Sequence, residues 1–378
     1  MAAFSRQSRA RRRSREPLPG KLRIVVGAVA LGLFLVARRF PDAVESLYGR
    51  HGYPWIAEAV GSVSGMVPFG LAEWVFLLIA LSILWAVPTY AKRMRRALEG
   101  WPRSLAAGAL GLVARIAFWW TAFVVLWGLN YARPAPERIF DLPPAVSSER
   151  RAELLREIGK RVDESRRSAP ETGAGVVAEA ASDRDREDLH RHLSALQGRA
   201  LRGFGLPSVE AGRPKRPLSS ALLLRWGIAG FYGPFTAEPH VVTPAPPGFL
   251  PFTTAHELAH LSGFATEDAA GFVGFLACLR SERPEVRYSA WLRLYLDLGG
   301  RPEGRSEAVG RDLRAIADFF ARHRRGREAE AIWRGYDRFL EAHGVRDGVE
   351  GYGRAPDLVL RWIDKHGMPR EPAPGEAG

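Results

Sequence analysis

The stretch His256-Glu257-Leu258-Ala259-His260 is the most informative part of this 378-residue chain. Its apolar periodicity predicts a helix over residues 253–261, and the two histidines, four positions apart, then share one helical face. Two neutral imidazoles so placed can hold one Zn²⁺ at about 2.0–2.1 Å each. The carboxylate of Glu257 can take a proton from a water at that metal and later return it. The stretch therefore predicts a helix that carries a metal site.

A zinc site that performs chemistry needs a third protein ligand. Gly263 lies three residues after His260 and can end the helix in a left-handed conformation. If the helix continued instead, Glu267 would lie about 10 Å further along the axis than His260, out of reach of the metal. With the turn, we expect Glu267 to be the third ligand. Asp268 is the alternative, and either acid can instead cap the helix that follows.

These residues resemble the zincin metallopeptidases, specifically the gluzincin branch with its glutamate ligand. More closely, the chain resembles a bacterial family of three-span membrane proteins with a C-terminal zincin-like domain. The resemblance covers most of residues 70–365, and its further blocks are residues 127–133, 230–238, 251–253, 288–290 and 347–353. It implies a Zn²⁺-dependent endopeptidase that acts on a peptide or protein substrate. The metal ligands would be His256, His260 and Glu267, and Glu257 would be the general base.

Two further features of the site follow from the zincin resemblance. It implies that an edge strand pairs with extended substrate and that the segment at residues 238–243 has this role. Tyr232 or Tyr352 can donate a hydrogen bond to the tetrahedral oxyanion, and their spacing in the chain selects neither.

One departure from the family favours a different function. Ala269 and Gly271 stand where such proteins carry a second acid and an amide or acid. Side chains behind a metal ligand orient it, so the support of Glu267 is reduced here. The alternative function is therefore a catalytically inactive zincin-like protein that binds metal or serves as a scaffold of the cell envelope.

Three apolar runs before the motif are candidate membrane spans, at residues 24–37, 74–90 and 105–131, the last interrupted by Arg115. Residues 1–23 carry eight Lys or Arg against one Glu, and residues 92–103 carry five against one. The positive-inside rule assigns both basic segments to the cytoplasm, which puts residues 132–378 outside the cytoplasmic membrane. A cleaved signal peptide is the alternative for the first run, although no small-x-small cleavage site follows it.

Charge and cysteine content argue against other classes of protein. The formal net charge is +13, but most of it comes from the two basic segments beside the apolar runs. The charge therefore indicates membrane topology and not a nucleic-acid-binding face. The one cysteine, Cys278, permits no intrachain disulfide and is expected to be buried in its apolar stretch. Charged neighbours of the motif argue against a metal site at membrane depth.

The sequence thus predicts a mainly α-helical, multi-pass protein of the cytoplasmic membrane. Three transmembrane helices precede an α+β zincin-like domain that is mostly helical. The predicted parts are a basic cytoplasmic tail at 1–23, a membrane domain at 24–131, an extracytoplasmic domain at 132–367 and a disordered tail at 368–378. Further helices are predicted over residues 147–168, 183–202, 268–280, 285–298, 306–324, 327–343 and 356–365, and a short strand over 241–243.

Overall fold

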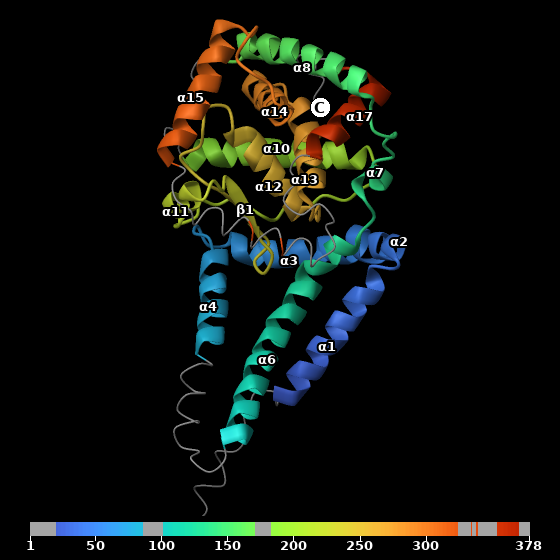
Figure 1. Cartoon of the computed structure of the whole chain (residues 1–378), viewed down its shortest axis with the longest axis vertical. Helices are drawn as coiled ribbons and strands as arrows, with labels where there is room; N and C mark the ends of the chain where they lie inside the picture. The colour runs from blue at the N-terminus through green and yellow to red at the C-terminus, as the bar shows by residue number, and fades with distance from the viewer. Residues whose placement is uncertain are drawn as a thin grey trace, which may run out of the picture. The chain divides into compact units, whose positions relative to one another are not determined.

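The computed structural model describes residues 20–85, 101–170, 183–323, 334, 338 and 354–369. The chain is mainly helical with one small sheet, as predicted (Figure 1). It folds as two compact units. The first contains Met1–Arg39 and Val75–Val125, and the second contains Phe40–Trp74 and Leu126–Gly378.

The first unit holds the apolar helices α1 (Gly20–Ala37), most of α4 (Ala72–Leu84) and nearly all of α6 (Trp101–Leu126). Within α6, the stretch Ala109–Leu126 has a mean hydropathy of 1.9 and is long and apolar enough to cross a membrane. Helix α4 is too short in its described residues to cross a membrane by this measure. Helix α1 is long enough only when the segment after it is counted as part of the same span. The described residues therefore contain one helix that qualifies as a span by itself, where the sequence predicts three.

Helices α1 and α6 pack closely within this unit. A Cβ added at Gly27 would overlap the side chain of Ala117, so only glycine allows this approach. The ring of Phe34 meets that of Trp120 edge to face, with centroids 5.9 Å apart. Large apolar side chains elsewhere on the two helices are exposed, including Leu33 at 63%. Exposed apolar surface of this kind suits a lipid environment.

The second unit contains the remaining elements. They are α2 (Pro41–Ala43), η1 (Val44–Gly52), α3 (Tyr53–Gly65), η2 (Gly128–Ala132), α7 (Pro136–Ile139), α8 (Ser148–Ser168), α10 (Asp183–Arg202), α11 (Ser220–Arg225), β1 (Gly230–Gly233), β2 (Glu238–Val241), α12 (Leu250–Leu261), α13 (Glu267–Leu279), α14 (Pro284–Asp297), α15 (Glu307–His323) and α17 (Ala355–His366). Every helix predicted within the described residues of this unit is present, with ends shifted by at most three residues. The predicted helix 327–343, apart from the helical residues 334 and 338, and nearly all of the tails 1–23 and 368–378 lie outside the described residues.

Helices α12 and α13 form the centre of the second unit, with α10, α14 and α17 packed around them (Figure 1). Every residue of α13 is buried, which its almost uninterrupted apolar sequence requires. Cys278 lies on this helix and is fully buried, as predicted, and burial raises the pKa of its thiol. The amphipathic helix α8 packs on α14 through one apolar stripe, and the Ser147 hydroxyl accepts from the Arg150 amide as its N-cap.

The sheet has two antiparallel strands, β1 and β2, with Gly230 opposite Val241. An isolated bridge joins His240 to Lys215 on the other side of β2. Strand β2 therefore has a neighbour on each side, and among the described residues β1 is the edge strand. The edge that was expected at residues 238–243 thus lies at β1 instead. The predicted strand 241–243 overlaps β2 only at Val241, because pairing with β1 sets the limits of the strand more than local propensity does.

The structural division differs from the predicted boundary at residue 132, because residues 40–74 fold with the second unit. Buried polar contacts explain the difference. Lys215 forms an ion pair with Glu238, and these side chains are 6% and 1% exposed. The Glu238 carboxylate also accepts from the backbone N–H groups of Leu71 and Ala72, at 3.1 and 2.7 Å. Buried charges need such partners, so these contacts fix the segment on the sheet.

Candidate metal centre

Helix α12 presents both histidines of the motif on one face, as predicted. The Nε2 atoms of His256 and His260 lie 3.2 Å apart. The helix begins at Leu250, with Pro251 in its first turn, where the missing N–H of proline costs nothing. Nine of its residues are buried, so the apolar positions around the motif pack into the core and fix the direction of the two imidazoles.

Helix α12 ends in the predicted left-handed turn, with φ +89° at Gly263. The N–H of Gly263 donates to the His260 carbonyl at 2.9 Å, and the N–H of Phe264 donates to the Ala259 carbonyl at 3.2 Å. These two bonds make a Schellman motif, which satisfies carbonyls at the helix end. The chain reverses there, and α13 begins at Glu267. The turn therefore brings an acid of the next helix back to the histidines.

Three potential ligand atoms converge at this point. The Oε2 atom of Glu267 lies 3.0 Å from Nε2 of His256 and 3.7 Å from Nε2 of His260. Tetrahedral zinc with bonds of about 2.0–2.1 Å holds its ligand atoms about 3.3 Å apart. The observed separations of 3.0, 3.2 and 3.7 Å bracket that value. Within the described part of the chain, this is the cluster of His, Cys, Asp or Glu residues that fits a metal ion.

The hydrogen bonding of His260 supports the same interpretation. Its Nδ1 lies 2.7 Å from the carbonyl oxygen of Phe264. Because a carbonyl only accepts, Nδ1 carries the proton, and in the neutral ring Nε2 presents a lone pair to the cluster. This arrangement is usual for histidines that bind metals through Nε2. The donor set therefore fits a zinc ion.

The buried cluster perturbs the pKa values of its members. Burial lowers the pKa of His256, and Glu267 opposes this shift without reversing it. Burial also acts to lower the pKa of His260, but the hydrogen bond and charge of Glu267 outweigh it and raise the pKa to about 9. For Glu267, burial acts upward, and the two histidines outweigh it and hold its pKa well below the usual range. The carboxylate is thus ionised and draws positive charge to this point.

Glu257, the residue predicted to be the general base, is buried close to the cluster. Its side chain is buried, and its Oε2 has no hydrogen-bond partner among the described residues. Burial raises the pKa of its carboxyl group to about 8. Strand β1 passes directly beside it, because a Cβ added at Gly230 would lie 2.5 Å from Oε1. Glycine at this position leaves space for the carboxylate.

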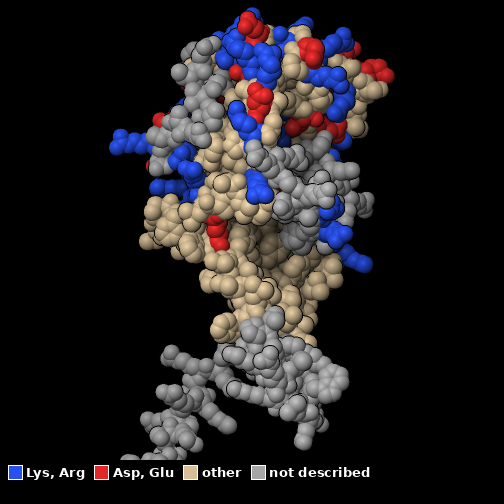
Figure 2. Space-filling model, turned by 60° about the vertical axis from the view of Figure 1, so that its left-hand side comes forward, with Lys and Arg blue, Asp and Glu red and all other residues tan. Residues whose placement is uncertain are grey.

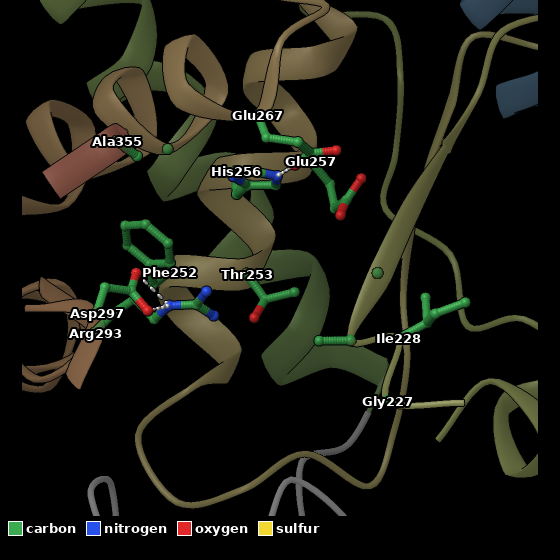
Figure 3. Close-up of a pocket in the computed structure, with 13 residues that line it drawn as sticks. Gly227, Ile228, Phe252, Thr253, His256, Glu257, Glu267, Arg293, Asp297 and Ala355 are labelled. Atoms are coloured by element: carbon green, nitrogen blue, oxygen red, sulfur yellow. Dashed lines mark hydrogen bonds and ion pairs between the residues drawn. The ribbon is translucent and has the colours of Figure 1, made fainter. Parts of the chain in front are cut away.

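The cluster opens into a cavity of about 440 Å³ (Figure 3). One wall is the segment 227–230 that leads into β1, and the opposite wall includes Arg293 and Asp297 at the end of α14. His256 and Glu257 lie between these walls. His256 and Glu267 of the cluster and the candidate base Glu257 therefore face one space that a small peptide segment can enter.

The other candidates from the sequence lie elsewhere. Asp268 accepts from the N–H of Ala269 at 2.8 Å and lies 3.8 Å from Nε of Arg354, so it does not join the cluster. The hydroxyl of Tyr232 lies 3.0 Å from that of Tyr53, and Tyr232 does not line the cavity. Tyr352, the other candidate oxyanion donor, is outside the described residues.

A set of polar contacts that holds the Gly263 turn in place was not predicted from the sequence. The Arg133 guanidinium donates to the Gly263 carbonyl at 2.7 Å and forms an ion pair with Glu45 at 2.7 Å. The Tyr53 hydroxyl donates to the Leu261 carbonyl at 2.9 Å. The sequence held one signal for these contacts, the resemblance block at residues 127–133, which ends at Arg133. This block lies far from the motif in sequence, so its proximity to the Gly263 turn was not visible there. These contacts tie residues 40–74 to the end of α12.

Replacement of Gly263 by alanine tests the turn. Alanine in a left-handed conformation costs about 1–2 kcal/mol. The added Cβ would also lie 2.8 Å from the Tyr53 ring, so a larger loss of unfolding free energy is expected. Gly299→Ala is the matched control, because Gly299 has φ +80° with no atom within 4 Å of the added Cβ. The measurement is the thermal unfolding midpoint of each variant, and equal losses in both would show that the Tyr53 contact is unimportant.

Comparison with known proteins shows that one family matches most of the chain, including the residues of the candidate metal centre. A family described as "Protein of unknown function (DUF3810)" matches residues 48–360. No curated protein and no solved structure matches the chain. The matched range includes most of the second unit, with α12, the Gly263 turn and α13. Because the match covers most of its length, the chain belongs to the DUF3810 family.

Proposed function

We propose that this protein is a membrane-anchored zinc metallopeptidase. The observation that carries the proposal is the convergence of His256, His260 and Glu267, with separations of 3.0 to 3.7 Å, together with a cavity that His256, Glu267 and Glu257 line. Three protein ligands leave one position of a tetrahedral zinc open, as catalytic sites require.

The residues around the cluster suit peptide hydrolysis. When bound, zinc supplies a Lewis acid that polarises a carbonyl and acidifies water. Glu257 is placed to take the proton of the attacking water and to deliver it to the leaving amine. Its Oε2, which has no hydrogen-bond partner among the described residues, is available for that proton. A divalent cation nearby also stabilises the ionised carboxylate, which counteracts the effect of burial on its pKa.

The edge strand supports a peptide as substrate. The Val242 N–H donates to the Ala229 carbonyl, which makes these residues a hydrogen-bonded pair. Antiparallel pairing alternates, so the backbone groups of Gly230 and Tyr232 point away from β2. An extended peptide can pair with such an edge. Because Gly230 lies beside Glu257, this edge would place a peptide bond near the base.

Membrane attachment is proposed through three spans, α1, α4 and α6, with the second unit outside the cytoplasm. Their exposed apolar side chains and the two flanking basic segments support it. Helix α3 adds support, because it packs the small residues Ala57 and Gly61 inward and exposes Trp55 at 80%, and Met66 directly after the helix is 82% exposed. Tryptophan on an exposed apolar face is typical of a membrane interface.

Cysteine labelling in intact cells tests this topology. With Cys278 replaced by serine, a Glu157→Cys variant on the exposed face of α8 is expected to react with a membrane-impermeant maleimide. An Arg95→Cys variant in the second basic segment is expected to react only after the cells are permeabilised. The opposite pattern would reverse the orientation, and reaction at both positions in intact cells would contradict three spans.

The inactive scaffold remains the second candidate on the basis of Ala269 and Gly271, but neither the buried Glu257 carboxylate nor the outward-facing backbone groups of Gly230 and Tyr232 have a use in it. Chelation separates the two functions. The purified full chain in detergent is expected to cleave members of a quenched fluorescent peptide library, to lose this activity with 1,10-phenanthroline, and to regain it with added Zn²⁺. If zinc-loaded protein cleaves no peptide, the peptidase proposal fails and the scaffold stands.

A further inference from the structure

Arg293 and Asp297 line the cavity but take no part in the proposed hydrolysis. The Nε atom of Arg293 donates to both carboxylate oxygens of Asp297, at 3.0 and 2.8 Å. The guanidinium carbon also lies 5.8 Å from the ring centroids of both Phe249 and Phe252. An ion pair on one edge and two aromatic rings hold the guanidinium in a defined position.

The remaining donors of Arg293 face the cavity. A guanidinium has five N–H donors, and Asp297 engages only the one on Nε. Figure 3 shows the two terminal nitrogens pointing away from Asp297 toward Thr253 and the cavity. Among the described residues that line this cavity, Arg293 is the sole lysine or arginine. A fixed pair of terminal nitrogens in a mostly apolar cavity is suited to a ligand with two acceptor oxygens.

We propose that Arg293 binds a carboxylate of the substrate, so that this protein selects peptides with a negative charge next to the cleaved bond. The proposal rests on the proposed function, because the metal cluster defines where that bond lies. The planar fork of terminal nitrogens matches a carboxylate in two parallel hydrogen bonds. A substrate ammonium group is disfavoured at Asp297, whose two oxygens already accept from Arg293.

The position of Arg293 limits which carboxylate can reach it. Its guanidinium lies beside the ring of Phe252, which is one helical turn before His256. One turn corresponds to about 5.4 Å along the helix. An extended peptide advances about 3.3–3.6 Å per residue. The carboxylate therefore lies within about two residues of the cleaved bond, either on an acidic side chain or at the C-terminus of the peptide.

Binding of matched peptide hydroxamates to the zinc-loaded full chain in detergent tests the proposal without requiring turnover. One pair carries aspartate or asparagine with an amidated C-terminus, and a second pair carries alanine with a free or an amidated C-terminus. Titration calorimetry is expected to show the acid of one pair binding roughly 10- to 100-fold more tightly than its amide. The pair that shows the preference identifies the source of the carboxylate.

Variants assign the preference to Arg293. Arg293→Gln is expected to remove it while retaining the affinity for the amides, and Arg293→Lys to retain part of it. Arg311→Gln is the matched control and is expected to change nothing, because Arg311 makes the same kind of one-turn ion pair, with Glu307 at 3.0 Å, away from the cavity. Thermal unfolding checks that each variant is folded.

Two results would overturn the proposal and leave the zinc site intact: equal affinity for acid and amide in both pairs, or a preference for acid that persists in folded Arg293→Gln. Failure of all four hydroxamates to bind the zinc-loaded chain would overturn the proposed peptidase site, with its open position on the metal, together with the carboxylate site. The failure of this inference is thereby distinguishable from the failure of the proposed function.

Discussion

Glu257→Gln is expected to lower kcat for peptide hydrolysis by roughly 10²–10⁴-fold while zinc stays bound. Glutamine has nearly the same shape as glutamate, so the cavity beside Gly230 is preserved. It cannot take a proton from water, however, and the step that Glu257 performs is lost. The loss should fall on kcat, with KM little changed, because the edge of β1 and the cavity walls remain.

The measurement combines initial rates on a cleaved library peptide with the zinc content of the same preparation. Glu307→Gln, on the exposed face of α15, is the matched control and is expected to behave as wild type. Retention of full activity in Glu257→Gln would remove Glu257 from the mechanism. Loss of activity together with zinc would instead show that the variant has damaged the cluster, and rates would then be compared after zinc is added back.

Loss of zinc is the expected result of replacing either His260 or Glu267 with alanine. Wild type is expected to bind about one zinc per chain, because three ligands converge at 3.0 to 3.7 Å. Two protein ligands hold the metal much less tightly than three. Elemental analysis of the purified full chain after dialysis measures this directly. The variant Glu267→Ala is the more informative, because it tests a ligand from outside the helix that carries the motif.

Asp268→Asn is the control for that experiment. Its carboxylate contacts the Ala269 N–H and approaches Arg354, so its loss is expected to leave zinc in place. Zinc lost in Asp268→Asn but kept in Glu267→Ala would transfer the ligand role to Asp268. A wild-type chain that binds no zinc, even when metal is supplied, would contradict the metal site itself.

Local sequence signals predicted the helices of the second unit well. The stripe of Leu154, Ile158 and Val162 in α8 has helical periodicity and is buried, and the apolar run of α13 is buried along its whole length. The turn at Gly263 was predicted because glycine readily adopts positive φ, and its two hydrogen bonds involve residues at most five positions apart. Interactions over so short a range depend on neighbouring residues alone. They can therefore be predicted without knowing which distant segment packs beside them.

Contacts between distant segments were not predictable in this way. The attachment of residues 40–74 to the rest of the second unit depends on the ion pair of Arg133 with Glu45 and on the Glu238 carboxylate, which accepts from the N–H groups of Leu71 and Ala72. The position of Arg293 in the cavity depends on the packing of α14 against α12. Charged residues spaced by tens of positions show no periodicity, and each has many possible partners in the sequence.

The sequence by itself determined that two histidines share one face of a buried helix, that a carboxylate adjoins them, and that the chain can turn back at Gly263. Only the tertiary structure decided which acid approaches the histidines. Glu267 and Asp268 are consecutive at the start of α13, so their side chains point about 100° apart around the helix. The rotation of α13 about its axis, fixed by its packing on α12, directs Glu267 to the cluster and Asp268 toward Arg354.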